Sequence, residues 1–103
     1  MTNVPVACSL TPGEAGDRVE EWRQFVNCQV VAVERGQRVI RLQLENSTDA
    51  VLAAADLARR EKACCPFFDF RLVLLPEAVW LVVEAPEEAA ALLNGLAGLR
   101  RDL

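Results

Sequence analysis

Histidine is absent from this chain of 103 residues, which contains four cysteines. Histidine is the commonest proton shuttle and a frequent metal ligand. Without it, any soft-metal binding or redox chemistry in this protein has to use the cysteine sulfurs. The sequence also has no Gly-rich phosphate loop and no serine in a nucleophile-like setting. Hydrolase chemistry is therefore the least favoured class, and we interpret the chain as a non-enzyme in preference to an enzyme.

Positive charge and long apolar runs are also scarce. The net charge of −4 and the pI of about 4.8 argue against nucleic acid as a partner, because that interaction depends on Lys and Arg. No apolar stretch reaches the ~20 residues that a membrane span needs. Residues 1–5 lack the basic start and apolar stretch of a signal peptide. We therefore expect a cytoplasmic protein without a membrane partner, in which thiols stay reduced.

Length and composition favour one folded domain, spanning residues 1–103. Apolar residues make up 52% of the chain, which is enough for a hydrophobic core. Charged residues make up 25%, which argues against disorder.

Hydrophobic periodicity and turn residues predict the element order β-α-β-β-α-β-β-α. We expect an α+β fold in two layers, with a mostly antiparallel sheet and helices on one face. A ferredoxin-like variant fits the first six elements, and a ββα unit repeated over 29–65 and 67–101 fits equally well. The expected strands are 4–10, 29–34, 38–45, 67–75 and 79–84. The expected helices are 14–27, one that begins after the capping residues 46–49 and ends at Pro66, and one that opens at Pro86.

The first helix has an apolar stripe at helical spacing, with one cation beside it. Arg18 lies four residues before Trp22, at the edge of this stripe. The stripe consists of Ala15, Val19, Trp22, Phe25 and Val26.

The most informative run is 61–68, Glu-Lys-Ala-Cys-Cys-Pro-Phe-Phe, which places two adjacent thiols at a helix end. Adjacent cysteines pair poorly with each other, because the bridge closes a strained ring. Cys64 and Cys65 can instead share one soft ion, with Cys8 as the natural third sulfur. Three thiolates, or two plus Glu61, suit Zn(II), Hg(II), Cu(I) or a trivalent arsenical.

Glu61 lies on the same helix face as Leu57 and the two thiols, so we expect it at the edge of the core. A partly buried carboxylate there needs a positively charged or hydrogen-bonding partner. Arg18 is the best candidate for that partner. Arg18 and Glu61 then support the metal ligands from behind and orient the site, or else form an ordinary ion pair that ties two helices together.

Other interpretations of the cysteines stay open. Free cysteine often packs as a small hydrophobe, which is the reading we favour for Cys28. Cys8 can instead form a reversible disulfide with Cys64 or Cys65, which predicts a redox protein. The negative C-terminal end of the helix disfavours a reactive thiolate.

Two aromatic residues, Phe67 and Phe68, follow the cysteine pair in the sequence, and Trp22 lies on the first helix. Phe67, Phe68 and Trp22 form either a wall of the site or part of the core. In a third interpretation the thiols only pack, and the exposed sheet face recruits a second copy to form a homodimer.

The motif resembles one found in a group of small bacterial proteins. The resemblance rests on Cys8, on Arg18-x-x-x-Trp22, on the run 61–70, and on Ala-Pro-Glu at 85–87. It covers nearly the whole chain, although Cys28 does not belong to the pattern. Related sequences are associated with heavy-metal-responsive regulators of the MerR kind, so the resemblance implies a role near metals. It implies no enzymatic activity for any residue.

Overall fold

A computed structural model describes residues 12–98 of the chain. The predicted strand 4–10, together with Cys8, lies outside these residues. The described elements follow in the order α1 (Pro12–Gln29), β1 (Val30–Arg35), β2 (Val39–Leu44), α2 (Thr48–Cys64), β3 (Asp69–Leu74), β4 (Val79–Glu84), the 3-10 helix η1 (Glu87–Ala89) and α3 (Ala90–Ala97).

The four strands form one sheet in the order β1-β2-β4-β3, and every neighbouring pair is antiparallel. The sheet therefore consists of two hairpins joined through their second strands, β2 and β4. Each hairpin follows a helix, so the described chain contains an α-β-β unit twice. The predicted α+β class is confirmed. The arrangement of the hairpins matches the repeat that the sequence offers as an alternative.

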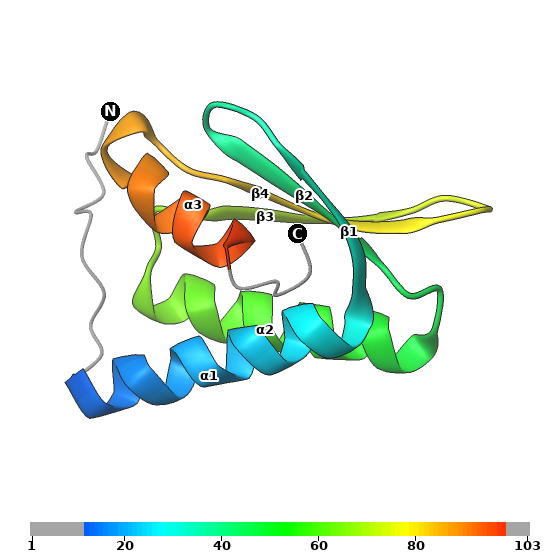
Figure 1. Cartoon of the computed structure of the whole chain (residues 1–103), viewed down its shortest axis with the longest axis horizontal. Coiled ribbons are helices and arrows are strands. Elements are labelled where there is room, and N and C mark those ends of the chain that lie inside the picture. The colour runs from blue at the N-terminus through cyan, green and yellow to red at the C-terminus, as the bar shows by residue number, and fades with distance from the viewer. Residues whose placement is uncertain (1–11, 99–103) are drawn as a thin grey trace.

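The core lies between the sheet and its helices. Figure 1 shows α1 and α2 on the same side of the sheet. Alternate side chains of β2 and β4 point to that side and are at most 4% exposed: Ile40, Leu42, Leu44, Val79, Leu81 and Val83. Burying a side chain of this size stabilises the fold by about 1.5–3 kcal/mol relative to leaving it exposed. The alternation of apolar and polar residues along β2 thus matches its one buried face.

The opposite sheet face is only partly covered among residues 12–98. Trp80 and Val82 of β4 are half-buried there, next to the exposed Arg41 of β2. The prediction that one face is in contact with water is confirmed. The homodimer that this face suggests stays a prediction.

Helix α2 begins and ends as its sequence predicts, and this positions the cysteines. The Ser47 hydroxyl accepts a hydrogen bond from the Ala50 N–H at 3.2 Å, which caps the first turn. The helix ends at Cys64, two residues before Pro66. The Cys65 N–H still donates to the Glu61 carbonyl at 2.7 Å, so both sulfurs stay close to the last turn.

Helix α1 presents a narrower apolar face than predicted. Trp22, Phe25 and Val26 are buried, but Val19 is 46% exposed because α2 lies on the Arg18 side of Trp22. The prediction that Cys28 packs in the core is wrong, since its thiol is exposed. Six residues after Trp22, Cys28 lies about 120° away around the helix, where it faces away from the core.

Candidate metal centre

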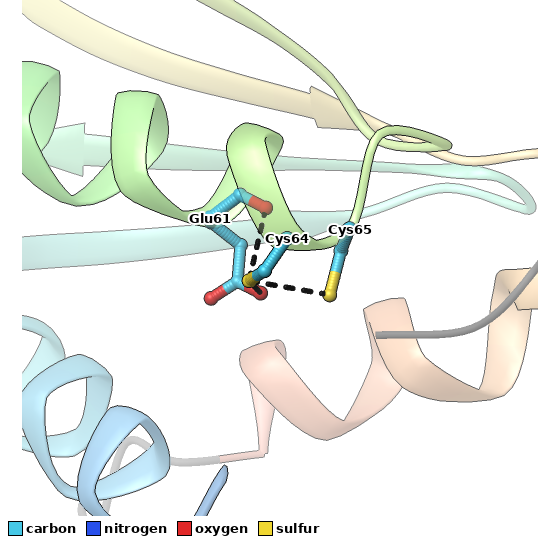
Figure 2. A group of neighbouring side chains, drawn as sticks. All are labelled: Glu61, Cys64 and Cys65. Carbon is cyan, nitrogen blue, oxygen red and sulfur yellow. Dashed lines mark hydrogen bonds between the residues drawn. The ribbon is translucent and has the colours of Figure 1, made fainter. Parts of the chain in front are cut away.

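Three possible metal ligands converge at the last turn of α2. Glu61 is 6% exposed, Cys64 8% and Cys65 1%. Figure 2 shows the Glu61 carboxylate and the two sulfurs on the same side of the helix end. One ligand atom from each residue lies within 4.8 Å of the other two. This buried group can hold a metal ion.

Two residues of α1 fix the Glu61 carboxylate. The Trp22 indole Nε1 donates a hydrogen bond to Oε1 at 2.7 Å, and the Arg18 guanidinium lies 3.4 Å from the same oxygen. The predicted pairing of Arg18 with Glu61 is therefore confirmed. Sequence reasoning gave Trp22 only an apolar role and missed its N–H donor. The four-residue spacing to Arg18 is the signal that could have found it, because both side chains project from one face of α1.

The Cys64 thiol is surrounded by the polar atoms of this pair. Its sulfur lies 3.4 Å from the Glu61 carbonyl oxygen, 3.6 Å from Glu61 Oε2 and 3.5 Å from an Arg18 nitrogen. Burial and then the charge of Glu61 raise the pKa of the Cys64 thiol, and the guanidinium of Arg18 opposes them in part. The thiol is therefore held protonated at neutral pH, and a bound cation is the natural means of displacing its proton.

The two neighbouring sulfurs are in contact but are not bonded to each other. Cys64 Sγ and Cys65 Sγ are 3.8 Å apart. Cys64 is a free thiol, whereas Cys65 is disulfide-bonded. The predicted third ligand, Cys8, lies outside the described residues. A metal ion can take both sulfurs of the pair only once Cys65 is reduced.

Aromatic side chains belong to the same buried core cluster as the two cysteines. Phe67 and Phe68 are 7% and 6% exposed, and their rings meet edge to face. Trp22 stacks on Phe70, with ring centroids 6.2 Å apart. Because Glu61, Cys64 and Cys65 are themselves buried, charge interactions at the site are stronger than they would be at the surface.

An ion-pair chain, missed by the sequence reasoning, connects the site to the surface. Arg60 donates to both carboxylate oxygens of Glu21, at 2.7 and 3.1 Å, and so bridges α2 to α1. The Arg60 side chain is half-buried between the two helices. The Arg60 hydrogen bonds lower the pKa of Glu21. Glu21 Oε1 also lies 3.5 Å from Arg18 Nε, although the two atoms do not form a hydrogen bond. Glu21 and Arg60 each adjoin a site residue in sequence, and this is the signal that could have found them.

Comparisons with protein-family models, with curated proteins and with solved structures find no match to this chain. The resemblance to the small bacterial group therefore stays a prediction. Within residues 12–98 no helix is long and apolar enough to cross a membrane.

Proposed function

We propose that the protein is a cytoplasmic thiol module, without catalytic activity, that binds one soft metal or metalloid ion through Cys64 and Cys65. The observation that carries this proposal is the buried group of two sulfurs and one carboxylate within 4.8 Å. Buried sulfurs beside a buried carboxylate suit a thiophilic cation, because thiolates select soft ions. Cys8 remains a candidate third sulfur ligand.

The surroundings of the site support this role. Arg18 and Trp22 orient Glu61 by contacts of 3.4 and 2.7 Å, as residues around metal ligands do. Phe67 and Phe68 belong to the same buried core cluster as the two sulfur-bearing residues. The resemblance to proteins that accompany heavy-metal-responsive regulators agrees with a metal-handling role.

Native mass spectrometry of reduced, anaerobic protein tests the proposal. The exposed Cys28 thiol can bind metal by itself, so every protein carries Cys28→Ser. A phosphine reductant keeps Cys65 reduced without competing as a thiol. With equimolar Zn(II), Cu(I), Hg(II) or arsenite, we expect one bound ion for at least one of them. That ion should be lost when Cys64 and Cys65 are also replaced by Ser. A parent protein that binds none of the four contradicts the proposal, as does an ion that survives the replacement.

A second candidate function is thiol redox chemistry, and the disulfide at Cys65 favours it. Because Cys28 and Cys64 are free thiols, we propose Cys8 as its partner. In this reaction two thiols lose two electrons and two protons to an external disulfide, which is reduced to two thiols. Metal binding and this oxidation compete for the same Cys65 sulfur.

Peptide mapping after mild oxidation with oxidised glutathione tests the redox candidate. We expect a peptide that joins Cys8 to Cys65, a mass loss of two hydrogens, and recovery of both thiols with reduced glutathione. Finding only free thiols after oxidation excludes this function.

A further inference from the structure

We infer that Glu61 is a direct ligand of the bound ion, and that the site is built for a divalent, four-coordinate cation of the Zn(II) or Cd(II) class. This inference rests on the proposed function, and it chooses the ligand role for Glu61 over the supporting role, both of which the sequence leaves open. Three independent features of the site support it: distances, carboxylate orientation and charge.

The distances fit tetrahedral coordination. Zinc–sulfur bonds of about 2.3 Å and a zinc–oxygen bond of about 2.1 Å place two sulfurs about 3.8 Å apart and a sulfur about 3.6 Å from an oxygen. The Cys64–Cys65 sulfur separation is 3.8 Å, and Cys64 Sγ lies 3.6 Å from Glu61 Oε2. A linear ion with the same bond length needs its sulfurs about 4.6 Å apart. The Cys65 sulfur and the Glu61 carboxylate lie within 4.8 Å of each other, and we expect these side chains to close on the ion once Cys65 is reduced.

The Glu61 carboxylate is oriented before any ion binds. Trp22 Nε1 and Arg18 both contact Oε1, and Oε2 lies 3.6 Å from the Cys64 sulfur. A carboxylate with one oxygen held by donors and the other directed at a metal position is typical of a ligand supported by its surroundings. Figure 2 shows this convergence of the carboxylate and the sulfurs.

Charge balance selects the divalent class. Glu61 and two thiolates contribute three negative charges, and the adjacent Arg18 contributes one positive charge. A divalent cation makes this buried group neutral, whereas a monovalent ion leaves it at −1 and a trivalent ion at +1. Because charge is costly in a buried site unless it is balanced, the neutral combination is favoured. The fourth position of the tetrahedron is left for water or for Cys8.

Cobalt(II) is the probe that tests the inference, because its visible spectrum reports four-coordinate geometry and sulfur ligation. Reduced protein with Cys28→Ser is titrated with Co(II), and Zn(II) then displaces the cobalt. We expect one Co(II) per chain, with the intense visible bands of a tetrahedral site and near-ultraviolet sulfur-to-cobalt charge transfer. Glu61→Gln should weaken Co(II) binding about 100-fold or more and should change the visible bands, since a lost ligand costs more than the 10–100-fold of a lost supporting contact.

Matched variants separate a ligand from a supporting residue. Glu20→Gln removes an exposed carboxylate of the same helix, 2.7 Å from Arg23 at the surface, and should leave affinity and spectrum unchanged. If Glu61→Gln does not fold, as judged by far-ultraviolet circular dichroism, Glu61→Asp keeps the charge but withdraws the oxygens. It should then give weaker binding with altered bands.

Two outcomes overturn this inference while the proposed function stands. The first is a Glu61→Gln protein that keeps the wild-type cobalt spectrum and affinity, while the double Ser replacement of Cys64 and Cys65 loses the ion. Where only Glu61→Asp folds, the same result for that variant counts instead. The second is a wild-type protein that binds Cu(I) in the mass assay but no Co(II) or Zn(II). A protein that binds neither Co(II) nor any of the four ions of the mass assay overturns both the inference and the proposed function.

Discussion

Removing the positive charge of Arg18 is the perturbation whose effect the structure defines best. The side chains of Arg18 and Glu61 are 14% and 8% exposed, with 3.4 Å between their charged groups. Breaking a buried ion pair by removing one partner costs about 3–5 kcal/mol. Glu61 keeps the Trp22 hydrogen bond and Arg18 is partly exposed, so we expect Arg18→Met to lower the free energy of unfolding by about 3 kcal/mol, the lower end of that range.

Urea denaturation of reduced protein measures this loss. With a slope of about 1.5 kcal/mol per molar urea, a loss of 3 kcal/mol moves the midpoint by about 2 M. The matched control is Arg23→Met on the same helix. Arg23 pairs with Glu20 at the surface, with side chains 38% and 52% exposed, so its loss should cost less than about 1 kcal/mol.

A double-mutant cycle isolates the pair. Glu61→Gln keeps an oxygen for Trp22 but removes the charge that Arg18 neutralises, so the double variant should be more stable than the two separate losses predict. We expect a coupling energy of about 2 kcal/mol. A coupling below about 0.5 kcal/mol, or equal losses for Arg18→Met and Arg23→Met, refutes the account of the buried pair.

Three further predictions concern the thiol, the indole and the helix cap. The pKa of the Cys64 thiol is raised in the folded protein. Below the ordinary thiol pKa this group therefore makes its full contribution to the free energy of unfolding, and the contribution is lost as the pH rises through the raised pKa. Urea midpoints in alkaline buffers should therefore fall faster for wild type than for Cys64→Ala, and parallel curves contradict this. Trp22→Phe should cost about 2–3 kcal/mol in the same assay, since it leaves Glu61 without its 2.7 Å donor, and a loss below 1 kcal/mol would exclude that role. Ser47→Ala should lower stability by about 1 kcal/mol through loss of the cap, measured as a shift in thermal midpoint, and an unchanged midpoint is the opposing result.

Local patterns made much of the fold predictable. The alternation of β2 determines its buried face, and Ser47 and Pro66 delimit α2, because these signals act within one element. The pairing of Arg18 with Glu61 was predictable as well, since each lies beside an apolar stripe and a buried carboxylate needs a partner.

Features that depend on how elements meet were not predictable in the same way. Which strands join the two hairpins is decided by packing across the sheet, and both candidate topologies fit the same element order. Cys28 seemed suited to the core by residue type, but its direction depends on which side of α1 meets α2. The indole donor of Trp22 is evident only when α1 and α2 are placed together.

X-ray absorption at the zinc edge tests most directly the claim that Glu61, Cys64 and Cys65 hold a metal ion. Reduced protein with Cys28→Ser, loaded with one equivalent of Zn(II), should show at least two sulfur ligands at about 2.3 Å and at least one oxygen ligand at about 2.0–2.2 Å. The sulfur signal should disappear when Cys64 and Cys65 are replaced by Ser. A zinc ion surrounded only by oxygen or nitrogen in the parent protein, or an unchanged spectrum after the replacement, contradicts the account.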